Sequence, residues 1–245
     1  MTGTGGNLMV DKDNGNPFAL YNGATITIDE GAKARLMATK YGGTGNDWDR
    51  DVEFLGVLAG KGDFEIANCV AGKSFTVRLT NGSPAFEGTV SVAPADAEAP
   101  TDGSLQVYPS TLIYAPAADA AMDWSKACLV FTDAVSLNPA GGTHLIVGEL
   151  SLAQNMTFRL NAENGDAIDV VGAGFTGAGA LSIALPEDFD PASQTFYPLG
   201  KIAKGAALPK VSGGNWKVTT QPIADDEDNL VYGIRSASGF VILIQ

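Results

Sequence analysis

Three glycines, Gly172, Gly174 and Gly177, have the G-x-G-x-x-G spacing of loops that hold the phosphates of a dinucleotide. Segment 167–171, which precedes them, is apolar enough to be the strand that such a loop follows. A dinucleotide-binding loop also opens a helix, but segment 178–185 alternates apolar and polar residues as a strand does. The sequence therefore predicts a glycine-rich turn or bulge between two strands, and no dinucleotide cofactor.

The chain contains one histidine, His144, the residue type that most often serves as a general base. It lies in the apolar run 143–147, and no G-x-S-x-G sequence supplies a nucleophile for it. Nucleophilic catalysis needs a nucleophile, a base and an orienting acid at convergent positions. We therefore expect His144 to be a structural residue of a strand, and we expect the protein not to be an enzyme.

Four acids, Asp47, Asp49, Asp51 and Glu53, alternate along the chain around Trp48. On a strand this spacing places the carboxylates on one face. Paired carboxylates beside an aromatic ring are suited to sugar binding or glycoside hydrolysis, but acids on a protein surface are mostly solvated. The pattern indicates an exposed segment that leads into a strand, with a glycan-active site as the alternative.

Two oxygen-rich segments could bind calcium, a cation that prefers carboxylate and carbonyl ligands. Residues 11–16 begin like a calcium loop, but their glycine comes one place early and no distal Glu follows. Asp225, Asp226, Glu227 and Asp228 form a cluster whose mutual repulsion a divalent cation would relieve. We expect an exposed acidic turn at 225–228 and no cofactor, with calcium as the alternative.

The charge of the chain restricts its partners. The 245 residues include 15 Lys and Arg against 28 Asp and Glu, a formal net charge of −13, and the basic residues do not cluster. Nucleic acids and anionic membranes are bound by basic surfaces, so neither is an expected partner.

No apolar run is long enough to span a membrane and the first residues do not resemble a secretory signal, so we expect cytosolic production or a signal already removed. Cys69 and Cys128 lack metal-type spacing, so we expect two buried thiols, with one disulfide as the alternative.

Alternating apolar and polar residues predict an all-β protein with little helix, apart from one helical turn at 117–126. The Asn-Gly pairs at 81–82 and 164–165 tolerate positive φ angles and therefore predict hairpins, and the pair at 22–23 predicts a turn before the strand 24–28. The expected fold is two β-sandwich or barrel-like units of mainly antiparallel short strands. The strands expected with the clearest patterns are 24–28, 34–39, 52–58, 64–70, 74–79, 86–92, 111–114, 127–131, 143–152, 156–160, 167–171, 180–185 and 230–234.

Residues 93–103 are rich in Pro, Ala and acids, which indicates a linker or an exposed loop. They divide the chain into an N-terminal arm with a first β domain, residues 1–92, and a second β domain, residues 104–245. Segments 73–82 and 155–165 share an apolar strand with a late Arg before Asn-Gly, a faint repeat that two related domains would produce.

The last apolar run of the chain consists of Phe240, Val241, Ile242, Leu243 and Ile244, here called the apolar tail. It is rich in β-branched residues and has no charge, so an open edge of this composition would aggregate. We expect the apolar tail to be covered on both faces, either as a central strand of the second domain or by a neighbouring subunit at an assembly contact.

Tandem β domains, an acidic surface and the lack of a catalytic constellation predict a structural protein of a symmetric assembly. The expected example is a virion component of a tailed bacteriophage, a head decoration or tail-tube-type protein assembled in the host cytoplasm. Its partners would be copies of itself and a capsid or tail protein. The alternative is a carbohydrate- or surface-binding module of an extracellular adhesin or cell-envelope protein, with Trp48, Trp124 or Trp216 as a stacking face.

Overall fold

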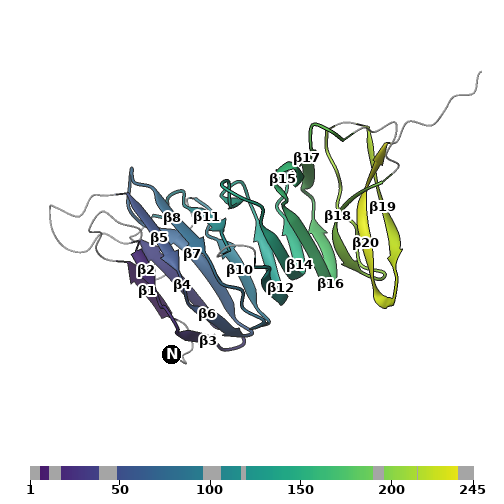
Figure 1. The fold of residues 1–245 in the computed structure, drawn as a ribbon. Coiled ribbons are helices and arrows are strands. Elements are labelled where there is room, and N and C mark those ends of the chain that lie inside the picture. Colours follow the sequence, from purple (N-terminus) through teal and green to yellow (C-terminus); the bar gives the residue numbers. More distant parts are fainter. Residues whose placement is uncertain are drawn as a thin grey trace, which may run out of the picture.

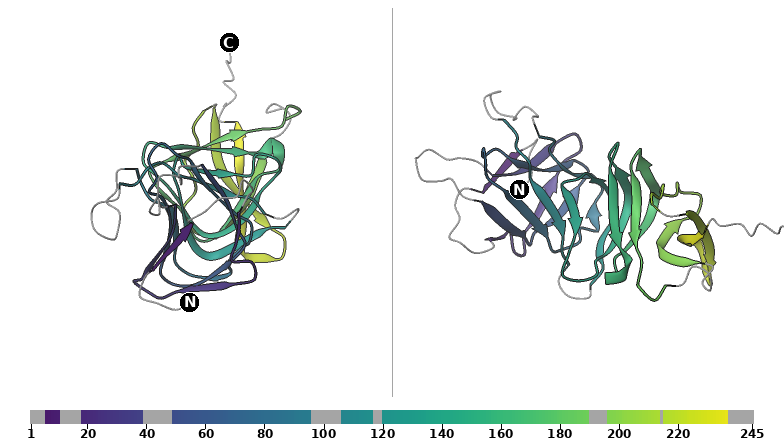
Figure 2. Two further views of the ribbon diagram at one scale, coloured as in Figure 1. Left: turned by 90° about the vertical axis from the view of Figure 1, so that its left-hand side faces the viewer. Right: turned by 90° about the horizontal axis from the view of Figure 1, so that it is seen from above.

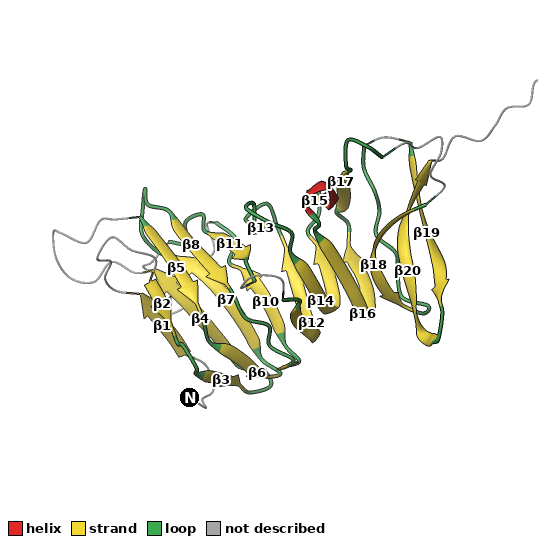
Figure 3. Cartoon of the chain, in the orientation of Figure 1, coloured by secondary structure: helices red, strands yellow, loops and turns green. Residues whose placement is uncertain are grey.

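The computed structural model describes residues 6–10, 18–38, 49–95, 106–116, 120–189, 196–213 and 215–236. Within these ranges most residues lie in strands, and the one helical element is a short 3-10 turn, η1 (Ala162–Asn164) (Figure 3). The prediction of an all-β fold with little helix is therefore confirmed. The helical turn predicted at 117–126 is wrong, because residues from Met122 onward belong to strand β12 (Met122–Phe131). None of the described helices is long and apolar enough to cross a membrane.

The strands stack in successive turns of the chain and form a parallel β-solenoid. Each of the first three turns passes through three strands that face different sides, and the strands of these turns pair in parallel with their counterparts one turn earlier. Figure 1 shows the turns following one another from the N-terminal to the C-terminal end, and Figure 2 shows them superposed along the stack. Two consecutive turns are β4 (Lys33–Ala38), β5 (Arg50–Phe54) and β6 (Val57–Gly60), then β7 (Asp63–Asn68), β8 (Phe75–Leu79) and β9 (Ala85–Phe86).

The strands form four sheets among the described residues. The long sheet has the order β1-β4-β7-β10-β12-β14-β16-β18-β20-β19, and the side sheet has the order β13-β11-β8-β5-β2. The other two are the short sheet β3-β6-β9 and the pair β15-β17. The remaining strands are β1 (Gly6–Val10), β2 (Phe18–Leu20), β3 (Thr25–Ile28), β10 (Thr89–Val92), β11 (Thr111–Tyr114), β13 (Val135–Leu137), β14 (His144–Leu152), β15 (Thr157–Asn161), β16 (Ala167–Gly177), β17 (Ala180–Ala184), β18 (Tyr197–Ala203), β19 (Trp216–Ile223) and β20 (Asp226–Ser236).

The prediction of mainly antiparallel pairing is wrong. Antiparallel ladders join only β18 to β20 and β19 to β20 among the named strands of the described chain. Asn81-Gly82 does not close a hairpin, because it lies at a corner between β8 of the side sheet and β9 of the short sheet. Asn164-Gly165 likewise lies at a corner, and Gly165 has a φ of 85°. The left-handed backbone at Gly165 suits a solenoid corner as well as a hairpin, so an Asn-Gly pair there does not distinguish the two. Neither Asn81 nor Gly82 has a positive φ, and Gly82 is instead placed where a Cβ would lie 2.4 Å from Asp123 N.

Along most strands every second residue points inward, and these inward side chains form a continuous hydrophobic core. Burying such a side chain contributes about 1.5–3 kcal/mol. Aromatic rings from different sheets meet inside it, as Phe54 and Phe64 do with ring centroids 5.5 Å apart. One inward row of the long sheet is Ala34, Phe64, Val90, Leu129, Leu150 and Phe175.

The predicted linker lies largely outside the described residues, which omit 96–105. The division into 1–92 and 104–245 therefore stays a prediction. Strands from both ranges belong to the long sheet, where β10 pairs with β12. The hydrophobic core also includes residues from both ranges.

Candidate functional site

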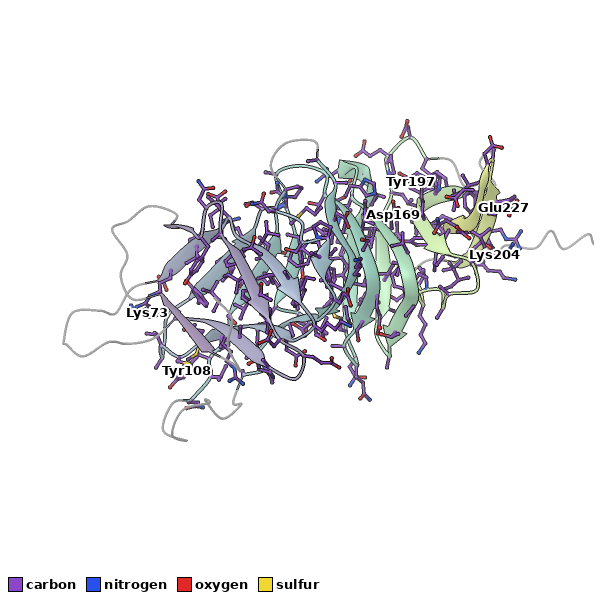
Figure 4. All side chains as sticks on the ribbon, turned by 90° about the horizontal axis from the view of Figure 1, so that it is seen from below. Lys73, Tyr108, Asp169, Tyr197, Lys204 and Glu227 are labelled. Atoms are coloured by element: carbon purple, nitrogen blue, oxygen red, sulfur yellow. The ribbon has the colours of Figure 1, made fainter. Side chains whose placement is uncertain are left out.

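The predicted acidic turn 225–228 lies at the tip of the C-terminal hairpin formed by β19 and β20, where Figure 4 labels Glu227. Its carboxylates are used locally: Asp226 Oδ1 accepts hydrogen bonds from Asp228 N at 3.2 Å and Asn229 N at 3.0 Å. Partial desolvation raises the pKa of Asp226, but hydrogen bonds from Asn229 and Asp228 outweigh it and lower the pKa overall. No three His, Cys, Asp or Glu side chains of the described chain group as a metal site would. Calcium binding at 225–228 stays a prediction.

The apolar tail, residues 240–244, lies outside the described residues, as do segment 11–16, Asp47 and Trp48. The last described residue is Ser236, which pairs with Trp216 at the start of β19. The apolar tail therefore follows directly from the end of the C-terminal hairpin.

Of the tryptophans considered for ligand stacking, Trp124 points into the core. Its side chain is 1% exposed and makes edge contacts with Phe86 and Tyr114. Trp216 is half-buried and its ring centroid lies 6.0 Å from that of Phe189. Trp124 thus offers no face to a ligand, whereas Trp216 keeps part of its ring accessible.

The described members of the acid row lie on β5 and just before it, next to the edge strand β2 of the side sheet. Asp51 and Glu53 alternate with buried Val52 and Phe54 along β5, as predicted. Asp51 is paired with Arg78 of β8, with Oδ2 2.9 Å from Nη2. Asp49 accepts a hydrogen bond from Ser74 N at 2.7 Å. These acids connect neighbouring turns on the outer surface and do not converge on a cleft.

The glycine motif lies where β16 turns a corner of the solenoid. Val147 pairs with Val170 and Glu149 with Gly174, so residues 171–173 bulge opposite Gly148 alone. A Cβ on Gly172 would lie 2.5 Å from the carbonyl oxygen of Gly148. The predicted bulge is confirmed, and the glycine is needed because two backbones approach closely there.

His144 joins a polar cluster that connects three strands of the long sheet. Its Nε2 lies 3.0 Å from Asp169 Oδ2, and Asp169 Oδ1 accepts a hydrogen bond from Lys201 N at 2.7 Å. Asp169 was missed by sequence reasoning, although a single acid in the apolar strand 167–171 was a visible signal. Figure 4 shows Asp169 near the C-terminal end of the stack, by Tyr197. The cluster links β14, β16 and β18 through side-chain and backbone groups, and the His144 side chain is 44% exposed. The structural role of His144 stays a prediction.

Both thiols are free, so the alternative of a disulfide is wrong. Cys69 is buried, and Cys128 is half-buried on the long sheet. Burial, followed by the neighbouring carboxylate of Glu149, raises the pKa of Cys128 to about 12. The thiolate is the reactive form, so Cys128 is a poor nucleophile at neutral pH.

The side sheet is interrupted between β13 and β15. The strand β13 is the last of its sheet and pairs with β11, whereas β15, at the equivalent place in the next turn, pairs with β17. The two strands flank a cleft of about 450 Å³, here called the side cleft. Its volume falls within the range of ligand sites. Arg159, Asn161 and Asp166 contribute polar lining, and Leu137, Met156 and Phe158 contribute apolar lining.

The buried carboxylate of Asp166 lies in the lining of the side cleft. Asp166, 7% exposed, accepts hydrogen bonds from Thr143 N at 2.8 Å and from Asn161 N at 3.2 Å. Burial raises the pKa of Asp166, although these two N–H groups act in the opposite direction. Asp166 therefore ties the chain before β14 to the end of β15, across the turn where the sheet pairing is lost.

Both flanking strands direct backbone groups into the side cleft. A strand residue points its N–H and C=O to the same side, and successive residues alternate. Ala180 N donates to Met156 O at 3.0 Å, so Thr157 and Arg159 point away from β17 and toward the cleft. Leu112 N donates to Ala134 O at 2.8 Å, so Leu137 likewise points away from β11. The side cleft thus lies between two strand edges.

One side-chain acceptor in the lining is also unsatisfied. Asn161 Oδ1 is buried and has no hydrogen-bond partner among the described residues. Buried polar atoms are almost always hydrogen-bonded, and each exception calls for an explanation. A ligand that donates hydrogen bonds to this wall of the cleft would supply one. No sequence signal predicted the side cleft, because it depends on which strands fail to pair.

Comparison with known proteins gives no further guide to the site: no protein-family model, no curated protein and no solved structure matches the chain.

Proposed function

We propose that the chain is a non-enzymatic structural subunit of a symmetric assembly, held together by its apolar tail. The observation that carries this proposal is the arrangement at the C-terminal end of the solenoid. The apolar tail follows Ser236, which lies beside Trp216 at the start of the edge strand β19. An uncharged segment of high β propensity is costly to expose, and the described chain ends at Ser236 beside β19, a strand with an open edge.

The architecture supports a mechanical role. One hydrophobic core runs through the stacked turns, and each turn is tied to the next by backbone ladders. Such a stack is a spacer whose ends and edges are the natural places for contacts between copies. Copies joined by the tail of one and an acceptor on the next form a head-to-tail contact, which closes into a ring when the rotation permits.

The narrower form of the proposal is a virion component of a tailed bacteriophage, a head decoration or tail-tube-type protein that binds a capsid or tail protein. It rests on analogy with the way such assemblies use arms and sheet edges. The alternative, a carbohydrate- or surface-binding module, has less support. Trp124 is buried, and Asp51 is paired with Arg78, so neither feature forms a sugar site.

The test is light scattering across a concentration series, with the intact chain and a chain lacking residues 240–245. We expect the intact chain to give a defined oligomer and the shortened chain to remain monomeric. Circular dichroism melts of both proteins control for folding. Equal masses for the two chains at every concentration would contradict the proposal.

A further inference from the structure

We propose that the side cleft is the acceptor for the apolar tail of a second copy, which enters it as an added strand between β13 and β15. This inference rests on the proposed assembly function and names the surface through which it acts. The addition would restore, across two chains, the pairing that the side sheet lacks at this turn. Strand addition to an open edge is a recurrent mode of peptide recognition, in which backbone hydrogen bonds supply affinity.

Two strand edges face the side cleft. Most edge strands offer one row of backbone groups, but here two rows face a single cleft, with Leu137 on one side and Thr157 and Arg159 on the other. The flanking strands have three and five residues. A single extended segment of similar length would hydrogen-bond to both, and the five-residue tail has that length.

The lining of the side cleft suits the residues of the apolar tail. The apolar part of the lining consists of side chains that are nearly fully buried, such as Met156 at 6% and Phe158 at 5% exposure. An inserted strand sets alternate residues against that floor, which suits Phe240, Ile242 and Ile244. The lining also contains Asp133 and Asp166, so an uncharged segment from a chain of net charge −13 avoids the repulsion that an acidic one would meet.

The strand β19 provides another open edge, at the C-terminal end of the long sheet. The outermost strand β19 carries Lys217 and Pro222, two residue types that block pairing at sheet edges. The strand edges at the side cleft contain no proline and no lysine. The side cleft is therefore the better acceptor of the two.

The reach of the chain favours the tail of a neighbouring copy. Between the side cleft and the C-terminal hairpin lie β15, β17 and the chain at Val211, which bridges to Leu181. Three strand spacings amount to about 14 Å. The four steps of the chain from Ser236 to Phe240 also span about 14 Å at full extension. The tail of the same chain therefore has no spare length to turn and enter its own cleft, whereas the tail of a second copy is not restricted in this way.

Two variants test the proposed contact: one disables the side cleft and keeps the tail, and the other lacks the tail and keeps the side cleft. The donor variant Thr157→Pro keeps the tail but removes an N–H that faces the cleft, at the first residue of β15, where proline is tolerated. The acceptor variant lacks residues 240–245 and keeps the cleft. Thr157→Ala is the matched control, because it retains the N–H. Melting curves establish that all three proteins fold.

We expect each variant alone to be monomeric by light scattering and an equimolar mixture to form a complex of one donor and one acceptor. Thr157→Ala should assemble like the intact chain. Hydrogen exchange gives a second readout: the amides of Thr157 and Arg159 should exchange at least tenfold more slowly in the assembled protein than in the tail-deleted one.

The outcomes separate the two proposals. If the tail deletion abolishes assembly but Thr157→Pro assembles normally and the two amides remain unprotected, the tail binds elsewhere and the cleft inference is overturned. If the intact chain never associates, the assembly function itself fails. Protection of the two amides in a monomeric intact chain would show that the tail fills its own cleft, which contradicts the second copy.

Discussion

The solenoid before and after β13 differs in how its turns are joined. Up to β13, successive strands of the side sheet pair without interruption from β2 through β5, β8 and β11. After β13 the side sheet stops, pairing resumes as the separate β15-β17 pair, and the long sheet ends in an antiparallel hairpin. The strands β14 and β15 after the interruption keep the alternation of buried and less buried residues, whereas β19 at the C-terminal end has no buried residue. The difference shows that alternation builds the core, while pairing decides where edges and clefts remain.

The largest effect should come from matched truncations in the two parts. Phe64 and Phe175 lie in the same inward row of the long sheet, before and after the interruption. Phe64→Ala should lower the free energy of unfolding by about 3–5 kcal/mol, and Phe175→Ala by less, because Phe175 is 6% exposed and its turn has lost the side sheet. Urea unfolding measures both. Equal losses would mean that the interruption does not loosen the core.

The next effect concerns the carboxylate at the interruption itself. Asp166→Asn replaces one acceptor oxygen with an NH2 group, so either Thr143 N or Asn161 N loses its partner. We expect a loss of about 1–3 kcal/mol, the usual cost of an unsatisfied buried donor. Asp51→Asn, at an exposed ion pair of the uninterrupted side sheet, is the control and should cost less. A neutral Asp166→Asn would show that the carboxylate does not hold the two turns together.

A smaller, opposite pair of effects is expected from two buried tyrosines. Tyr114 of the side sheet has a hydroxyl with no hydrogen-bond partner among the described residues, whereas Tyr232 of the C-terminal hairpin donates to Ile168 O at 2.8 Å. Tyr114→Phe should therefore be neutral or stabilising, and Tyr232→Phe should cost about 1 kcal/mol. Thermal melts of the two variants check the sign. A destabilised Tyr114→Phe would show that its hydroxyl has a partner.

The strands and their buried faces could be predicted from the sequence, but their partners could not. The alternating segment 24–28 became β3, and the alternation of acids with Val52 and Phe54 on β5 was correct. Alternation identifies the buried face and says nothing about whether the neighbour is one hairpin or one solenoid turn away. The faint repeat between 73–82 and 155–165 marked β8 and β15, which occupy equivalent places in different turns.

The side cleft could not be predicted because it is a property of pairing between residues far apart in sequence. Nothing local to Leu137 or Thr157 reveals that β13 and β15 fail to pair. The nearest signal was Asp166, an acid just after Asn164-Gly165, whose role depends on the backbone of Thr143. The bulge at Gly172 could be predicted, because it depends on the local spacing of Gly172, Gly174 and Gly177 in the sequence.

The smallest effect is expected at the acidic turn. Because Asp226 already accepts hydrogen bonds from Asp228 and Asn229, we expect the melting temperature to be the same with calcium and with a chelator. The variant Asp226→Ala serves as the control for the turn itself. A calcium-dependent rise in melting temperature that this variant abolishes would establish a metal site at 225–228.

The central claim, assembly through the apolar tail, is tested most directly by the mass in solution of the donor and acceptor variants, alone and mixed. Light scattering should give the mass of one chain for each variant alone and of two chains for the mixture. If the two variants remain monomeric when they are mixed, assembly through the apolar tail is contradicted, whether or not the intact chain associates.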